Sequence, residues 1–250
     1  VKFDSIKLEI FEGSRLIRTL KQKAPKENGI HRMYWSMNEK GADRPSRKIR
    51  KRTNEPRGVS VKPGTYNLKM SFGNQTSESS IKVEFDPRLE MSTEAITEIY
   101  NASKDMEKDQ QLMADVVKQL VESKNTATAF KKDLAKEDKK NYKDQINASK
   151  DIITKIDKLI AVYIGSIDKR QGITRNPEVT VSRRYSSARR YVGSRFGNLT
   201  TTEKQLISQY KKALETAINK TNAFFETDWR TYKTTLETIR ISPFKEIQKF

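Results

Sequence analysis

His31 is the only histidine of the 250-residue chain and is therefore the first candidate for acid–base chemistry. It lies in the stretch GIHRMYWSM, residues 29–37, where alternation places His31, Met33 and Trp35 on one face of a predicted strand. A general base needs a positioned partner and a pocket, and a zinc site needs further ligands, yet the chain has no second histidine. We therefore expect His31 to be a structural residue in the middle of a strand.

No other pattern in the sequence indicates catalysis. The chain contains no cysteine, which excludes disulfides, thiolate nucleophiles and cysteine-based zinc sites. It also has no phosphate-binding glycine-rich loop, no Gly-x-Ser-x-Gly elbow and no EF-hand calcium loop. Its carboxylates lie among lysines on predicted helices, where pairing between residues four apart accounts for them. We therefore expect a protein that is not an enzyme, with no catalytic residue, no cofactor and no metal.

The strongest chemical signal is positive charge. The formal net charge of +18 attracts anionic partners such as nucleic acid, acidic polysaccharide, lipid headgroups or an acidic protein. The sequence RPSRKIRKRTNEPR, residues 44–57 and called the basic segment below, interrupts the predicted strands with seven basic residues and one acidic residue. Its candidate interaction residues, called the five central cations below, are Arg47, Lys48, Arg50, Lys51 and Arg52.

Two interpretations of the basic segment stay open. One is a solvated loop, and the other is a loop that docks onto an anionic surface or a partner protein. Proteins that bind single-stranded nucleic acid interleave aromatic side chains with positive charge, and this segment contains no aromatic residue. We therefore do not expect specific nucleic-acid binding.

A second basic cluster lies on a short helix predicted over residues 178–195. The cluster consists of Arg183, Arg184, Arg189, Arg190 and Arg195. On a helical wheel the apolar stripe is formed by Val181, Tyr185, Ala188 and Val192. Arg183 and Arg190 lie directly opposite this stripe and are further candidate interaction residues. Their face is either the solvated side of an amphipathic helix or a surface that binds an acidic partner.

The secondary structure predicted to position these residues changes from strands to helices near residue 86. Before it, the residues alternate between two faces in four segments, residues 6–11, 30–37, 65–72 and 79–85, and residues 15–20 are predicted as the hairpin partner of the first segment. Turns are predicted at Gly13, at Pro63-Gly64 and at Gly73, because proline fixes φ and glycine accepts a positive φ. Five or more short strands without a long helix indicate a β-sandwich.

After residue 88 the pattern predicts a bundle of three long helices and one short helix. No Gly or Pro occurs from Ser92 to Ala135, and a seven-residue repeat, called the heptad seam below, consists of Ile99, Met106, Met113, Leu120, Ala127 and Leu134. The second long helix is expected after a break at residues 136–141, ends at Gly165, and carries the stripe Ile146, Ile153, Ile156, Ile160 and Tyr163. Thr200 and Glu203 form a capping box at the start of the last helix.

Three motifs give the first 90 residues a resemblance to a known family. They are Gly29-x-His31-Arg32-x-x-Trp35, Pro63-Gly64-Thr65-Tyr66 and Asp86-Pro87-Arg88. The stretch resembles the flagellar-hook-cap type of immunoglobulin-like module that occurs in bacterial BNR-repeat, sortilin-type β-propeller proteins, which are glycosyl-hydrolase-like. His31 stands where that family commonly has Asn. No Ser-x-Asp-x-Gly-x-x-Trp propeller box occurs in this chain, so the resemblance implies no hydrolase activity here.

The expected fold class is α+β in two segregated domains. Residues 1–88 are expected to form the immunoglobulin-like sandwich that the resemblance implies, and residues 89–250 an antiparallel helical bundle. The chain begins Val1-Lys2-Phe3 without an initiator Met or a signal peptide, so we expect a piece of a longer protein. No apolar run approaches the about 20 residues that span a bilayer.

These features favour a non-catalytic interaction or structural module of a larger bacterial protein. The resemblance implies a location in the cell envelope, in the periplasm or at the cell surface, or secretion. It also implies a β-propeller of the same protein or complex as first partner, besides other cell-envelope proteins. One alternative is a basic module that binds an acidic glycan, another acidic polymer or a lipid membrane surface. Another is an accessory domain of a carbohydrate-active enzyme.

Overall fold

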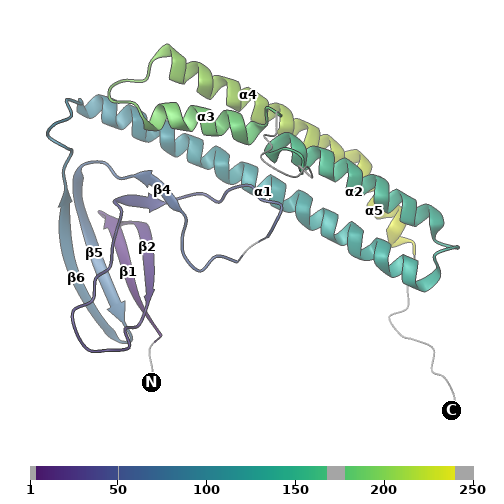
Figure 1. Ribbon diagram of the computed structural model, residues 1–250, viewed down its shortest axis with the longest axis horizontal. Coiled ribbons are helices and arrows are strands. Elements are labelled where there is room, and N and C mark those ends of the chain that lie inside the picture. The colour runs from purple at the N-terminus through teal and green to yellow at the C-terminus, as the bar shows by residue number, and fades with distance from the viewer. Residues whose placement is uncertain (1–3, 50, 168–177, 240–250) are drawn as a thin grey trace, which may run out of the picture. The chain divides into compact units, whose positions relative to one another are not determined.

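The computed structural model describes residues 4–49, 51–167 and 178–239. The chain is a mixed α/β structure with a four-stranded antiparallel sheet in its N-terminal region, followed by the helices α1 to α5 (Figure 1). It packs as two compact units. The first unit comprises Val1–Asp115 and Arg183–Tyr210, and the second comprises Val116–Ser182 and Lys211–Phe250.

The four-stranded sheet of the first unit is built from two hairpins in the order β2-β1-β5-β6. Its strands are β1 (Ser5–Glu12), β2 (Arg15–Lys23), β5 (Gly64–Phe72) and β6 (Gln75–Val83). The register places Leu8 of β1 opposite both Leu20 of β2 and Met70 of β5. Each hairpin turns through a glycine with φ of 59°, Gly13 in one and Gly73 in the other, a conformation that tight hairpin turns require. The sequence predicts these four strands and their turns.

The predicted strand over residues 30–37 is wrong. The described structure has no strand there, and the next strand is the short β3 (Asn38–Lys40), which pairs with β4 (Arg57–Ser60) in a separate two-stranded sheet. The Trp35 ring packs edge-on against Tyr66 with 5.6 Å between centroids, and its Nε1 donates to the Asn38 carbonyl at 2.9 Å. The alternation in residues 30–37 therefore indicates which side chains pack against the core, although these residues form no strand.

The core beneath the sheet is small. Leu8, Ile10, Ile17 and Tyr66 are buried, and partly buried side chains such as Trp35 pack against them. The Tyr66 hydroxyl donates to the Lys62 carbonyl at 2.7 Å, which fixes the corner where the chain enters β5.

Helix α1 (Thr93–Asp138) is a single helix that contributes residues to both units. From Met106 to Leu134, each member of the heptad seam is at most 1% exposed, as the seven-residue repeat predicts. The other helices are α2 (Lys143–Ile164), α3 (Val181–Gly193), α4 (Thr201–Phe224) and α5 (Arg230–Glu237), with a π-helical segment η1 (Phe225–Trp229) joining the last two. Among the described residues, no helix has the length and apolar character needed to cross a bilayer.

The second unit is held by buried side chains that carry a few paired hydroxyls. Helix α2 buries Ile146, Ile152, Ile156, Ile160 and Tyr163. The prediction placed Ile153 in this stripe, but Ile152 occupies the buried position and Ile153 is half-buried. Tyr163 and Thr221 share a hydrogen bond of 2.9 Å between their hydroxyls, and Ser149 and Tyr232 share another of 2.9 Å. These bonds satisfy hydroxyl groups that would otherwise be buried without partners.

Candidate interaction groove

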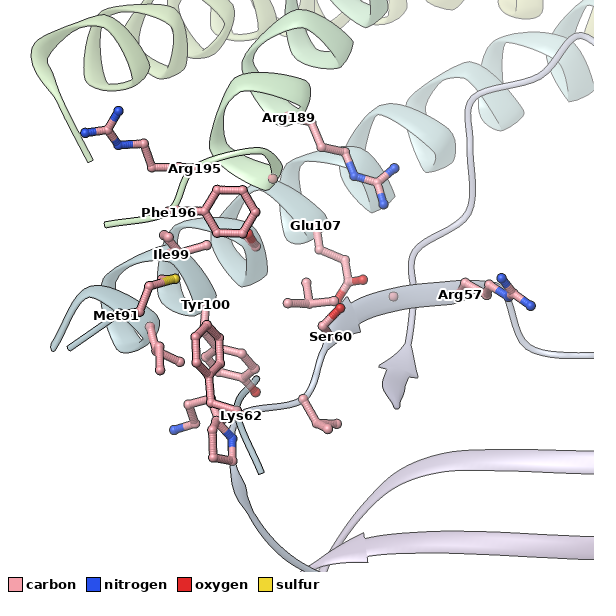
Figure 2. A pocket seen from close by; sticks show the side chains of 18 of the residues that line it. Arg57, Ser60, Lys62, Met91, Ile99, Tyr100, Glu107, Arg189, Arg195 and Phe196 are labelled. Atoms are coloured by element: carbon pink, nitrogen blue, oxygen red, sulfur yellow. The ribbon is translucent and has the colours of Figure 1, made fainter. Parts of the chain in front are cut away.

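A groove of about 460 Å³ opens in the first unit, a size that suits a bound side chain or small ligand (Figure 2). Three segments line it. They are β4 with the residues that follow it to Pro63, the chain from Phe85 through the first turns of α1, and the end of α3 with residues 195 and 196. The groove thus brings together positions more than one hundred residues apart in sequence.

One side of the groove is apolar. Its side chains come mainly from the entry to α1 and include Leu89, Met91, Ile96 and Ile99. Phe196 closes this side, and 68% of its surface is exposed (Figure 2). Phe196 extends the half-buried apolar wall to the surface, and contiguous apolar patches of this kind mark sites where proteins or ligands bind.

A close backbone approach lets β4 pass beside α1. A Cβ placed on Gly58 would lie 2.7 Å from both Glu107 Oε1 and the Lys40 carbonyl, a distance that side chains do not tolerate. Gly41 also approaches β4 closely, with its Cβ position 2.3 Å from the Arg57 carbonyl. Glycine is therefore required at both positions for the groove wall to form.

The loop after α3 is tied to α1 by one carboxylate. Glu98 accepts hydrogen bonds from the Asn198 side chain at 2.9 Å and from the Leu199 backbone N–H at 3.1 Å. The capping box predicted at Thr200 and Glu203 follows immediately, with the Thr200 N–H donating to Glu203 at 2.8 Å. These contacts set the position of Phe196, which lies between α3 and this anchor.

Beside the groove, a buried carboxylate joins the strands to α1. The side chain of Glu39 is only 4% exposed and pairs with Arg15 of β2 at 2.9 Å and with Lys104 of α1 at 3.1 Å. The Tyr100 hydroxyl also donates to it. Burial alone would raise the pKa of Glu39, but the hydrogen bonds from Arg15, Tyr100 and Lys104 outweigh it and lower the pKa to about 2. Burial and the bond to Glu39 raise the pKa of Tyr100 to about 12.

The groove carries an excess of positive charge. Its charged lining residues are four bases, Arg57, Lys62, Arg189 and Arg195, and one acid, Glu107. Glu107 is already paired with Lys104 at 2.5 Å. The Lys62 ammonium lies 4.9 Å from the centre of the Tyr100 ring, and Arg195 donates to the Asn198 carbonyl at 3.0 Å. Within the described ranges, neither Arg57 nor Arg189 forms an ion pair with a carboxylate.

The residues singled out from the sequence lie outside the groove. Of the five central cations, Arg47, Lys48, Lys51 and Arg52 lie in the loop between β3 and β4, and Arg50 is outside the described residues. Arg183 and Arg190 are exposed on α3, away from its buried stripe, as predicted. The groove is lined instead by other residues of the same two clusters. They are Arg57 from the basic segment and Arg189 and Arg195 from the second cluster.

Sequence reasoning missed the anchor of the basic segment. Arg18, only 6% exposed, donates to the carbonyls of Glu39 and Glu55 at 3.1 Å each and also to the Pro56 carbonyl. The Glu55 carboxylate in turn accepts the Thr19 N–H at 2.8 Å. The sequence gives no signal for this role of Arg18, because a buried arginine that binds loop carbonyls cannot be distinguished by sequence from a solvent-exposed arginine in a strand.

His31 lies in an irregular segment, so the prediction that it sits in the middle of a strand is wrong. Its ring is exposed, and its Nε2 lies 2.9 Å from the Glu27 carbonyl. Among the described residues, no group of three acidic, histidine or cysteine side chains could hold a metal ion. Comparisons with protein-family models, curated proteins and solved structures find no match to this chain.

Proposed function

We propose that the chain is a non-catalytic module for protein–protein interaction, and that the groove of the first unit is its docking site. The observation that carries the proposal is the exposed Phe196 beside an apolar wall, with Arg57 and Arg189 close by, neither of which forms an ion pair with a carboxylate among the described residues. Protein interfaces combine an apolar centre with a polar rim, and arginine and aromatic residues are enriched among the side chains that dominate binding.

The proposal places the module in a larger bacterial cell-envelope or secreted protein. Its first partner is a β-propeller of the same protein or complex, as the resemblance implies. In this proposal the strands belong to an immunoglobulin-like sandwich, and the helices form an antiparallel bundle of three long helices and one short one. The bond from the Tyr66 hydroxyl to the Lys62 carbonyl supports the sandwich, because a tyrosine bonded to the backbone a few residues upstream marks a corner of such folds.

A second candidate function is binding to an acidic polymer or a membrane surface. It is favoured by the exposure of Lys48, Lys51 and Arg52, which project from the loop between β3 and β4. Counterion release would then give a binding constant that falls steeply with salt. The groove argues against polyanion or membrane-surface binding as the main function, because a polyanion would make no contact with the apolar wall.

Photocrosslinking of the full-length gene product in its native cell tests the proposal. A photoreactive phenylalanine analogue replaces Phe196 in one variant and Phe72 of β5, which is 39% exposed, in a control. We expect a protein crosslink at the Phe196 position, which mass spectrometry then maps to one segment of a β-propeller or another envelope protein. The same protein captured equally from both positions, or no protein captured at either, would refute an interaction site in the groove.

A further inference from the structure

We propose that the groove binds an acidic peptide segment that carries one bulky apolar residue. The apolar side chain packs against Phe196 and Ile99, and the carboxylates face Arg57 and Arg189. This assignment rests on the proposed function and adds to it the chemistry and the direction of the partner.

The apolar half of the groove sets the anchor. Figure 2 shows Phe196, Ile99 and Met91 gathered on one side, where they come from α3's trailing loop and from the chain entering α1. Phe196 is 68% exposed, so a partner side chain placed beside it would remove apolar surface of both molecules from water. A single leucine, phenylalanine or tryptophan has the size and shape for this position.

The basic half sets the charge of the partner. Arg57 and Arg189 lie on the other side of Glu107 in Figure 2. Glu107 does not compensate them, because its carboxylate is bound by Lys104, whose ammonium also contacts the buried Glu39. Two guanidinium groups without ion pairs among the described carboxylates therefore border the groove. Guanidinium groups bind carboxylates through two parallel hydrogen bonds, so Asp or Glu side chains are the complement.

The separation of the two halves gives the partner a direction. An apolar residue at the Phe196 end and carboxylates at the Arg57 end must lie on the same peptide a few residues apart. A uniform polyanion would leave the apolar half unfilled, and an apolar peptide would leave the two arginines without partners. The arrangement therefore favours a mixed acidic and apolar segment over either alternative.

Selection from a display library of random dodecapeptides on the full chain tests this inference without assuming a sequence. We expect enriched peptides to share one bulky apolar residue with Asp or Glu a few positions away. A resynthesised peptide with a fluorescent label then reports affinity by anisotropy against the parent chain and three variants, each checked for unchanged circular dichroism.

The variants separate the two halves of the groove. Phe196→Ala and the double change Arg57→Glu with Arg189→Glu should each weaken binding about tenfold or more. Arg184→Glu, on an exposed position of α3 outside the groove, is the matched control and should leave affinity within about twofold. A peptide with Lys in place of its acids should bind the double variant better than the parent, which a folding defect cannot produce.

The outcomes distinguish this inference from the proposed function. Enrichment of neutral or basic peptides that still lose binding with Phe196→Ala would overturn the acidic partner and leave the docking site standing. No enrichment, or enriched peptides that bind every variant equally, would overturn the inference. Anionic phospholipid vesicles bound more tightly than any peptide, with loss in the double variant, would overturn it in favour of a membrane surface.

Discussion

Replacing Glu39 with Gln removes the buried charge that joins β2, β3 and α1 and keeps the shape of the side chain. Each pKa unit corresponds to about 1.4 kcal/mol, so a pKa lowered from 4.5 to about 2 corresponds to about 3 kcal/mol of stability near neutral pH. We expect Glu39→Gln to destabilise the first unit by about that amount, because Lys104 and Arg15 lose their shared carboxylate.

The pH dependence gives this prediction its sign. The folded-state pKa of Glu39 lies below the unfolded-state value, so its contribution is complete above pH 4.5 and is lost as pH falls toward 2. At pH 3 about 2 kcal/mol of the contribution should be gone. The Gln variant has no such proton to bind, so the difference in unfolding free energy between parent and variant should shrink on acidification.

Urea unfolding followed by tryptophan fluorescence measures the difference. Trp35 lies in the first unit and Trp229 in the second, so a Trp229→Phe background makes Trp35 the reporter of the unit that contains Glu39. Glu78→Gln on β6 is the control, since Glu78 forms an exposed pair with Lys69 and should change stability little. A gap between parent and Glu39→Gln that is absent at pH 7, or that stays constant down to pH 3, would refute the reasoning.

Three further predictions concern the groove wall, the helices and the basic segment. Gly58→Ala should destabilise the first unit by about 1–3 kcal/mol in urea unfolding, because its Cβ meets Glu107 and a backbone carbonyl at 2.7 Å. Leu120→Ala should cost about 2–5 kcal/mol, measured by Trp229 fluorescence, because the side chain is fully buried in the heptad seam. Changing the five central cations to Ser should leave circular dichroism and melting temperature unchanged and weaken assembly with the native partner, while duplex DNA binding at physiological salt is weak in parent and variant alike.

Two of these predictions have a matched control, and all three have a contradicting result. Gly193→Ala has free space around the new methyl group, and Leu112→Ala removes a side chain that is 44% exposed, so both should be nearly neutral. Equal effects in Gly58 and Gly193, or in Leu120 and Leu112, would contradict the packing described. Tight DNA binding with a steep salt slope that the five-site change reduces would promote the polyanion function.

Periodic segments were predictable because one physical cause produces their pattern. The heptad seam of α1 and the alternation of β1 reflect burial of one face, and the structure buries those faces. The same cause misled over residues 30–37, where Met33 and Trp35 lean on the core without a partner strand. Alternation indicates which side chains are buried. A β-strand also needs backbone hydrogen bonds to a neighbouring strand, and the alternation does not show whether such a neighbour exists.

The groove and the Glu39 cluster were out of reach for a different reason. Glu39 and Tyr100 are separated by 61 residues, and Gly58 meets Glu107 across 49. Nothing in the sequence distinguishes Glu39 from the other acidic residues, of which there are 32 in all, or Gly58 from the other glycines, of which there are 10 in all. The basic clusters were recognised, but helical-wheel geometry selected the outermost arginines, while the groove uses Arg189 at the flank of α3.

The π-helical segment η1 has a consequence for insertions and deletions. The residues buried along α4 before it recur at steps of three and four, and they are Leu214, Ala217, Thr221 and Phe224. Continuing those steps would reach position 231 or 235, yet α5 buries Tyr232 and Leu236, one residue later. The segment thus contains one residue more than a regular α-helix would need between the same buried positions. This is the geometry expected of an α-helix that accommodates a one-residue insertion as a π-bulge. Deleting one residue within Phe225–Trp229 should give a straight α-helix with the same buried face, whereas a deletion within α5 should rotate Leu236 out of the core.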